Sequence, residues 1–279
     1  MKKSFIVLIV FFLQSAYAYD FRVLSWNVYM LPPPIKDSLQ FSRIKAIPAA
    51  LKNTSHDLIF MQEAFMSMLR SKVKSALKVT HPYTYYLKNP SFPFPVEGSG
   101  LFIVSRWPLK LLDHVYFNTC TDADCLASKG SALIEITLPA GQKIQVANTH
   151  LQAVRTAGQI RMNQLGQIHR MLLKHFKKDI PQFLIGDLNI ADSEPEFMMG
   201  LNLMGMDFTQ ITGPILWTSG RNNPCFKVGD KHAWIDHMWH DNYSGIRSNN
   251  MQVRIMDFPY QGQNCPLSDH HAVEAAFHF

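Results

Sequence analysis

The chain has 279 residues, of which 47% are hydrophobic, and a formal net charge of +6 at pH 7. This length permits one large domain or two small ones, and the lack of a Ser/Gly-rich linker, a charge block or a repeat favours one. The positive charges are spread along the chain. They are therefore compatible with an anionic surface but do not indicate nucleic-acid binding by themselves.

The first residues have the pattern of an export signal. Lys2 and Lys3 precede an unbroken apolar run over Phe5–Leu13, which is too short to span a membrane. A small-residue cleavage pattern ends at Ala18. We therefore expect residues 1–18 to be a signal peptide and residues 19–279 to form a single domain, secreted or periplasmic after cleavage. No later stretch approaches the ~20 apolar residues of a spanning helix.

In the first half of the chain, alternating or continuous apolar runs predict strands, and apolar residues at helical spacing predict helices. Pro48 lies within the first helical pattern, where it should mark the helix start or a kink. The expected helices are Leu39–Lys52 and Phe65–Val79, and the expected strands are Phe21–Tyr29, Asp57–Gln62, Tyr83–Leu87, Leu101–Val104, His114–Phe117, Ala132–Leu138 and Lys143–Thr149.

The second half of the chain continues this mixture. The expected helices are Ala157–Lys177 and Glu194–Leu203, and the expected strands are Gln182–Gly186, His232–Trp239, Gln252–Met256 and Ala272–Phe279. Strands outnumber helices, and hairpins mix with crossovers. We therefore expect an α/β fold in which two mixed sheets pack together and helices lie outside.

Four cysteines in an exported protein are free to oxidise, and they allow three pairings. Cys120 and Cys125 are close in sequence within a polar loop, which favours a local bridge. Cys225 and Cys265 would then form the second pair. A metal site built from these cysteines is not expected, because no C-x-x-C spacing occurs.

Polar side chains gather where predicted strands end. Ligands of α/β sheets collect at strand ends, so we expect these side chains to converge on one site. Together they supply histidines, carboxylates and amides, which suits a divalent metal and a phosphoester. The residues concerned are Asn27, Glu63, His150, Asp187, Asn189, Asp236 and His270.

Glu63 and Asn27 are the first candidates for a metal ion. Magnesium prefers oxygen ligands and keeps several waters, so one or two carboxylates with an amide suffice. Taken alone, Glu63 could equally be a solvated strand end and Asn27 a turn cap. Asp187 and Asn189 point the same way if their strand continues, so one could fix an imidazole or a metal-bound water while the other holds a phosphate oxygen. A plain Asx turn is the alternative.

His150 and His270 are the candidates for acid–base catalysis, because imidazole titrates near neutral pH. One could accept a proton from water while the other stabilises the departing group. Asp269 is adjacent to His270, although neighbouring residues of a strand face opposite ways. Asp187 or Asp236 could orient His270 instead.

Motifs of rival mechanisms are absent from the sequence. No H-E-x-x-H motif supports zinc hydrolysis, and no G-x-S-x-G motif supports a serine nucleophile. No Walker motif or dinucleotide fingerprint occurs either. A metal-dependent phosphodiesterase is therefore the favoured interpretation.

In their order along the chain, these motifs resemble those of the endonuclease/exonuclease/phosphatase superfamily, which has the DNase I-like fold. Within it the chain looks most like the secreted bacterial sphingomyelinases C, a kind of neutral sphingomyelinase. The stretches that carry this closer resemblance are Trp26-Asn27-Val28-Tyr29-Met30-Leu31-Pro32, Val104-Ser105-Arg106-Trp107-Pro108, Ser128-Lys129-Gly130 and Thr149-His150-Leu151-Gln152-Ala153.

The resemblance implies a four-layer α/β/β/α sandwich holding a magnesium-type ion, with Mn²⁺ or Co²⁺ as other divalent cations. It implies that this ion lies on Glu63 with Asn27 nearby. It further implies that His270 activates the attacking water and that His150 and Asn189 contact the phosphate.

The resemblance also implies roles for three more residues. Asp187 and Asp236 would support the site, at a metal or by orienting a histidine, and Lys129 would lie close to the phosphate or headgroup. A loop lysine beside a glycine turn is the alternative for Lys129. The implied reaction hydrolyses sphingomyelin to ceramide and phosphocholine.

Such an enzyme has to reach a membrane surface. Secreted relatives carry an aromatic-tipped hairpin before Ser-Asp-His, and the corresponding stretch here contains Phe258 and Tyr260 but no adjacent Trp-Phe pair. Phe92 and Phe94, in a proline-rich loop, could supply an exposed apolar wedge instead. All four residues are candidates for membrane contact.

A DNase-like nuclease and an inositol-lipid phosphatase are the main alternatives, because substrate choice lies in the loops. The diffuse charge lowers the expectation for nucleic acid. A non-catalytic membrane-binding protein is the remaining alternative, and the retained acid, base and metal residues argue against it. The expected partner is a membrane phospholipid. No protein partner is implied, and we expect a monomer.

Overall fold

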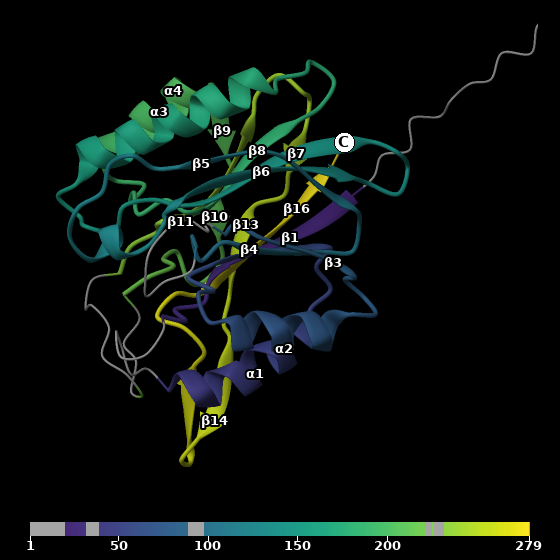
Figure 1. Cartoon of the computed structure of the whole chain (residues 1–279), viewed down its shortest axis with the longest axis vertical. Coiled ribbons are helices and arrows are strands. Elements are labelled where there is room, and N and C mark those ends of the chain that lie inside the picture. The colour runs from purple at the N-terminus through teal and green to yellow at the C-terminus, as the bar shows by residue number, and fades with distance from the viewer. Residues whose placement is uncertain (1–19, 32–38, 89–97, 221–224, 226–231, 279) are drawn as a thin grey trace, which may run out of the picture.

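The computed structural model describes residues 20–31, 39–88, 98–220, 225 and 232–278. Within these residues the chain forms four layers, with two helices over each outer face of a pair of sheets (Figure 1). The helices on one side are α1 (Gln40–Lys52) and α2 (Ser67–Leu77), and those on the other side are α3 (Gly158–Lys174) and α4 (Pro195–Met204). The expected α/β/β/α sandwich is confirmed.

The first sheet has eight strands in the order β10-β13-β16-β1-β2-β4-β3, with β12 paired to β16. Strands from both ends of the described chain are neighbours in it, because β1 and β16 pair antiparallel. The strands are β1 (Asp20–Asn27), β2 (Leu58–Gln62), β3 (Tyr83–Tyr86), β4 (Phe102–Ser105), β10 (Ile211–Thr212), β12 (Arg247–Ser248), β13 (Met251–Arg254) and β16 (Ala272–His278).

The second sheet has six strands in the order β5-β6-β7-β8-β11-β9. It mixes antiparallel pairs with the parallel pair β7–β8, which α3 connects. The strands are β5 (Leu109–Tyr116), β6 (Gly130–Thr137), β7 (Lys143–His150), β8 (Gln182–Asp187), β9 (Met206–Phe208) and β11 (Asp236–Asp241).

Alternate side chains of the central strands pack into different cores. In β1, Phe21 and Val23 belong to the core between the sheets, whereas Leu24 and Trp26 belong to the core beneath α1 and α2. This follows from the period of two along a strand. Both faces of each sheet are covered, so the central strands are apolar almost throughout.

Several boundaries differ from the sequence prediction. The first helix begins at Gln40, so Pro48 lies inside α1 and does not mark its start. Strand β5 begins at Leu109, earlier than expected, and β11 begins only at Asp236. The residues before β11 are held by a bridge between Ser219 and Ala233, a long-range pairing that local pattern does not reveal. Strands β9, β10 and β12 were not predicted because they are too short to show a period.

A hairpin before Ser268 was also not predicted as strands. Strand β14 (Asp257–Tyr260) pairs with β15 (Gln263–Pro266), and Phe258 lies opposite Cys265. Pro259 lies within this run, and proline has no N–H for a strand ladder. A ribbon of only two strands tolerates it. The hairpin projects from the body of the protein beside α1 (Figure 1).

Both expected disulfides are present, Cys120–Cys125 and Cys225–Cys265. The first closes a short loop around the 3₁₀-helix Asp122–Leu126, and the second joins Cys265 in β15 to Cys225. Among the described residues, no helix has the length and apolar character to cross a bilayer. The expected signal peptide, residues 1–18, lies outside the described part.

His237, in β11, gives the fold an acid-sensitive point. Its ring is packed among Phe197, Trp234 and Trp239, and its Nε2 atom lies 2.8 Å from the Ile190 carbonyl oxygen. Burial lowers the pKa of His237 to about 4. Between roughly pH 6.5 and pH 4, His237 therefore binds a proton in the unfolded chain but not in the folded chain.

We predict that this proton uptake removes about 2–3 kcal/mol of unfolding free energy as the pH falls from 7 to 4. The substitution His237→Gln, whose amide can still donate to the Ile190 carbonyl, should flatten that part of the profile. Urea denaturation at several pH values measures it. An unchanged slope in the variant would show that other groups cause the acid sensitivity.

Candidate active site

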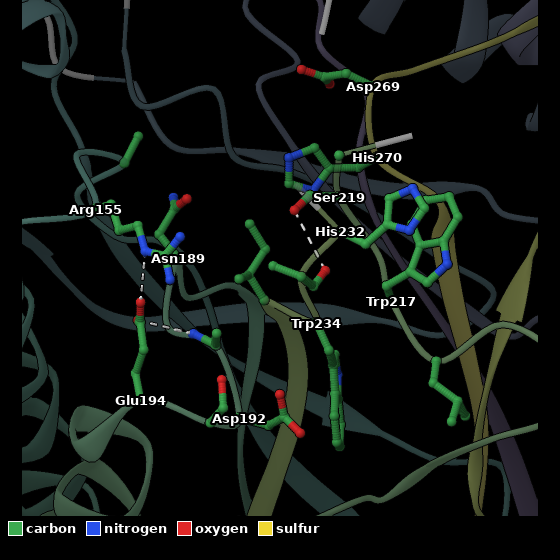
Figure 2. Close-up of a pocket in the computed structure, with 17 residues that line it drawn as sticks. Arg155, Asn189, Asp192, Glu194, Trp217, Ser219, His232, Trp234, Asp269 and His270 are labelled. Atoms are coloured by element: carbon green, nitrogen blue, oxygen red, sulfur yellow. Dashed lines mark hydrogen bonds and ion pairs between the residues drawn. The ribbon is translucent and has the colours of Figure 1, made fainter. Parts of the chain in front are cut away.

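The predicted site residues lie at one edge of the sandwich, because strand register brings their strand ends together. Asn27 pairs with Gln62 across the parallel strands β1 and β2, which places Glu63 next to Asn27. His150 pairs with Asp187 across β7 and β8, and Asp236 pairs with Asp187 across β11 and β8. Figure 2 shows His270 and Asn189 among the residues that line the adjoining pocket.

The backbone is in an unusual conformation at this edge. Tyr29, Glu63 and Asn189 have φ values of 47°, 52° and 51°, in the left-handed region. Such residues cost about 1–2 kcal/mol each, and they concentrate at functional sites. Gly186 also has a positive φ of 145°, and a Cβ atom there would lie 2.0 Å from the Thr149 carbonyl oxygen. Only glycine therefore lets β8 approach β7 this closely.

Asn27 links the two sheets. Its Nδ2 donates to Glu63 Oε1 at 3.1 Å and to Asp187 Oδ2 at 3.0 Å, while its Oδ1 accepts from the Tyr29 N–H at 3.0 Å. The backbone donor fixes the amide orientation, because a flipped amide would set two donors against each other. Asn27 thus presents its nitrogen to the carboxylates, and its role at a metal ion stays a prediction. Its place beside Glu63 is as expected.

The Glu63 carboxylate is held in a setting that disfavours its charge. Burial, and then the negative charge of Asp269, raise the pKa of Glu63 to about 7. Glu63 Oε2 has no hydrogen-bond partner among the described residues. A cation at this atom would offset both penalties.

Asp187 faces several groups at once. Its Oδ2 lies 3.4 Å from His150 Nε2 and 3.8 Å from His270 Nε2. Burial and the neighbouring Asp236 raise the pKa of Asp187 to about 6. Like Glu63, it is an acid whose charged form calls for a nearby cation.

His270 and Asp236 form a hydrogen-bonded pair, with Nδ1 and Oδ2 separated by 2.8 Å. Burial lowers the pKa of His270, but the negative charges of Asp236 and Asp187 raise it by more. The pKa of His270 therefore lies well above its usual value. Asp236 therefore orients the His270 ring. Asp236 was one of the two residues considered for this role in place of Asp269. Ser268 supports the turn by donating to the Asn27 carbonyl at 2.6 Å.

His150 contacts Lys129, whose Nζ lies 3.2 Å from His150 Nε2 and donates to the Leu151 carbonyl at 2.8 Å. Burial, then the charges of Lys129 and His270, hold the pKa of His150 well below its usual value. His150 is therefore neutral at pH 7.

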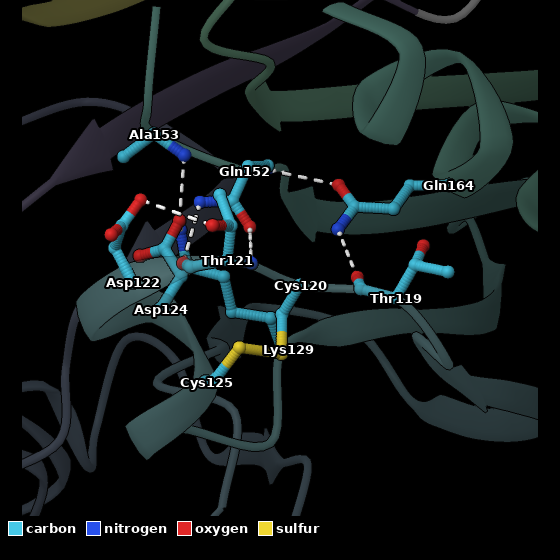
Figure 3. The surroundings of a disulfide bond; sticks show 10 residues. All are labelled: Thr119, Cys120, Thr121, Asp122, Asp124, Cys125, Lys129, Gln152, Ala153 and Gln164. Carbon is cyan, nitrogen blue, oxygen red and sulfur yellow. Dashed lines mark hydrogen bonds and ion pairs between the residues drawn. A yellow bond between two sulfur atoms is a disulfide. The ribbon is translucent and has the colours of Figure 1, made fainter. Parts of the chain in front are cut away.

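Asp124 holds this lysine from the other side, with 2.9 Å between its Oδ2 and Lys129 Nζ. The same oxygen accepts from the Ala153 N–H at 2.6 Å, as Figure 3 shows. Asp124 lies inside the loop closed by Cys120–Cys125. Sequence reasoning missed Asp124, since nothing in its neighbourhood distinguished it from an ordinary loop carboxylate.

Asn189 and Asp269 both line the pocket. Strand β8 ends at Asp187, so the alternation expected between Asp187 and Asn189 does not apply. The Asn189 N–H instead donates to Asp187 Oδ1 at 3.0 Å, and its side-chain amide donates to the Leu151 carbonyl at 3.1 Å. This turn still directs both residues toward the site.

Two groups of residues have the chemistry of a metal site. Asp187, Asp236 and His270 offer ligand atoms within 4.8 Å of one another. The hydrogen bond between His270 and Asp236, however, already uses Nδ1 and one oxygen of that group. Glu63 Oε2 and Asp236 Oδ1 are both buried without a partner among the described residues, so each carboxylate has an oxygen left for a magnesium-type ion.

The expected membrane contacts have different outcomes. Phe258 is only 7% exposed and packs in the core beneath α1 and α2, so it offers no free ring to a membrane. Cys265 lies opposite Phe258 in the hairpin. The disulfide between Cys265 and Cys225 fixes this part of the hairpin against the core. Tyr260 is partly buried beside it. Phe92 and Phe94 lie outside the described residues.

Comparison with known proteins places this geometry in a family. A model of the Endonuclease/Exonuclease/phosphatase family matches residues 24–270. A phospholipase C of Staphylococcus aureus is 29% identical over 198 residues, which cover 64% of this chain and 59% of that protein. A sphingomyelinase C of Listeria ivanovii is 23% identical over 291 residues, covering 92% of this chain and 86% of that protein.

Solved structures agree on the fold. A mutant of beta toxin from Staphylococcus aureus, with bound magnesium ions, superposes with a TM-score of 0.76 at 21% identity. The match covers 92% of this chain and 99% of that one. The family model spans most of the chain, and the strand-end residues occupy one site. The protein therefore belongs to the endonuclease/exonuclease/phosphatase family.

Proposed function

We propose that the protein is an exported, magnesium-dependent phosphodiesterase that hydrolyses sphingomyelin to ceramide and phosphocholine. The observation that carries this proposal is the convergence of buried carboxylates, two histidines and a lysine at one strand-end edge. The named relatives at 23% and 29% identity support the substrate class. The two disulfides support export, because such bonds persist in oxidising compartments.

Glu63 would hold the magnesium ion, with Asn27 and Asp187 beside it. When bound, such an ion neutralises phosphate charge and stabilises the leaving oxygen. His270 accepts the proton of the attacking water at Nε2, and Asp236 stabilises the imidazolium that results. This assignment is supported by the 2.8 Å bond at Nδ1, which leaves Nε2 pointing toward the site.

The phosphate oxygens would meet Lys129, His150 and Asn189. Lys129 supplies a positive charge, and neutral His150 supplies a hydrogen-bonding ring without adding a second charge. The Asn189 amide adds a further donor. His150 Nε2 and His270 Nε2 lie 3.4 Å and 3.8 Å from the same Asp187 oxygen, so the phosphate and the attacking water would be held next to each other.

The membrane contact is proposed at an apolar groove that Phe258 also lines, although the Phe258 ring is only 7% exposed. This groove, about 520 Å³ in volume, is lined by Phe41, Met68 and Tyr260 together with Lys45 and Lys72. Phe41 and Met68 are 64% and 49% exposed. Apolar side chains flanked by lysines are typical of interfacial binding to phospholipid.

The deciding experiment measures phosphocholine release from sphingomyelin vesicles in magnesium and in chelator. Nicking of plasmid DNA and phosphate release from inositol lipids are measured in parallel. Phosphocholine release that requires the metal supports the proposal. Nicking alone would favour a nuclease, phosphate release alone an inositol-lipid phosphatase, and vesicle binding without turnover a non-catalytic protein.

We expect Glu63→Gln to abolish turnover and to weaken its dependence on magnesium, because the amide cannot offer the same charge to a cation. Glu135→Gln makes the same chemical change at a carboxylate paired with Lys143, in the middle of the second sheet. Activity titrated against magnesium checks both variants. If Glu63→Gln retains wild-type activity, its ligand role is wrong.

We expect His270→Ala to lower kcat by about 100-fold or more, the usual worth of a positioned base. His278→Ala is the matched control, because His278 also pairs with an aspartate, Asp20, but at the far end of β16. Asp236→Asn should shift the acid limb of the rate profile to lower pH. Asp236 raises the pKa of His270, so its loss frees the neutral ring at lower pH while the maximal rate falls. An acid limb that does not move would contradict this pairing.

The double substitution Phe41→Ser and Met68→Ser should reduce hydrolysis in vesicles several-fold and leave a soluble phosphodiester unaffected, because only vesicle hydrolysis requires surface binding. Leu173→Ser is the control, since Leu173 is 61% exposed but lies on α3, in the opposite helix layer. Vesicle sedimentation checks binding directly. An equal loss on both substrates would indicate a folding defect instead.

A further inference from the structure

The pocket beside His270 extends well beyond the reacting groups. It has a volume of about 970 Å³ and runs from His270 and Asn189 to a wall formed by Trp217 and Trp234 (Figure 2). Only the end with His270 and Asn189 contains groups of the proposed reaction. The aromatic end has no role in positioning water or a metal ion.

The aromatic wall is built rigidly. Trp217 stacks on His232 with ring centroids 3.9 Å apart and planes 8° apart. Trp234 is only 6% exposed and is packed from behind by Phe197 and Phe208. A surface of this kind offers π-electron density and apolar contact without moving.

The same wall is fixed to the catalytic pair through the backbone. The Trp234 Nε1–H donates to the Asp236 carbonyl at 2.9 Å. Thr218, next to Trp217, accepts from the Asp236 N–H at 3.2 Å through its hydroxyl, and its carbonyl accepts from the His271 N–H at 2.7 Å. A group held by the wall therefore has a set position relative to His270.

The charge of the pocket favours a cation. Asp192 lines it, is exposed, and makes no ion pair or hydrogen bond within the described part of the chain. Glu194, by contrast, is paired with Arg155 and Arg161. Asp192 therefore leaves a negative charge at the pocket that Trp217 and Trp234 also line.

We propose that this pocket binds the quaternary ammonium group of the substrate, with Trp217 and Asp192 as specificity-determining residues. This rests on the proposed function and goes beyond it by assigning the headgroup site. A methylated cation cannot donate a hydrogen bond, so aromatic faces and an unpaired carboxylate suit it better than hydrogen-bond acceptors alone. A primary ammonium would gain less from the aromatic wall.

The test compares kcat/KM for sphingomyelin, ceramide phosphoethanolamine and bis(p-nitrophenyl) phosphate, the last of which has no cationic headgroup. Trp217→Leu should lower the value for sphingomyelin about tenfold but that for ceramide phosphoethanolamine less than about threefold, while Trp217→Phe restores most of the difference. Asp192→Asn should lower kcat/KM about threefold or more for both substrates with a cationic headgroup and spare bis(p-nitrophenyl) phosphate, which has none. Asp207→Asn, at an exposed aspartate of β9, should change nothing.

An unchanged ratio of sphingomyelin to ceramide phosphoethanolamine in folded Trp217→Leu would overturn the proposal. If that variant does not fold, Asp192→Asn is the deciding variant. An equal loss of kcat/KM on all three substrates in Asp192→Asn would overturn the proposal. Inhibition of bis(p-nitrophenyl) phosphate hydrolysis by phosphocholine separates this proposal from the function itself. Phosphocholine should inhibit the wild type more strongly than phosphoethanolamine even if sphingomyelin is not cleaved, and no such difference would reject the headgroup site.

Discussion

The site is governed by an electrostatic conflict among buried acids. Glu63 and Asp187 are enclosed at the edge of the sandwich, and burial raises the pKa of both. Asp236 and Asp269 add like charge, and Lys129 with His270 only partly balances it. Such a group is tolerated when further positive charge arrives with a ligand. The edge therefore favours the binding of a divalent cation and the transfer of a proton to His270.

The fold fixes the position of each of these side chains, which lie on different strands or in the turns next to them. Asn27 donates to one carboxylate of each sheet, so the sheet interface itself sets their spacing. The left-handed conformations of Tyr29, Glu63 and Asn189 store strain that the covered sheets on either side can support. Strand ends and the turns beside them thus hold this charge arrangement.

The regions around this edge differ in what they control. The Cys120–Cys125 loop carries Asp124, which positions Lys129 beside His150. The wall around Trp217 is joined through Thr218 to the segment that orients His270. Under the proposed function, one region would bear on phosphate charge and the other on the headgroup. The family's fold serves many phosphoesters, so these two regions would distinguish the substrate.

Local pattern in the sequence determined a large part of this protein. Continuous apolar runs mark strands covered on both faces, and the polar residues at their ends, such as Glu63, His150 and Asp187, already indicated a phosphoester site. The two disulfide pairs followed from the spacing of the cysteines. The strands and the Cys120–Cys125 bridge depend on neighbours in the chain, so periodicity and spacing revealed them, and Cys225–Cys265 was then the remaining pair.

Only the tertiary structure decided how these parts meet. Asp236 rather than Asp269 bonds His270, because antiparallel pairing of β8 and β11 sets Asp236 opposite Asp187. The Asn27 amide faces the carboxylates with its nitrogen, because the Tyr29 N–H occupies its oxygen. Phe258 turns inward because its hairpin partner Cys265 is tied by a disulfide. Each outcome depends on contacts between residues far apart in sequence, which pairing register and packing set and local pattern does not encode.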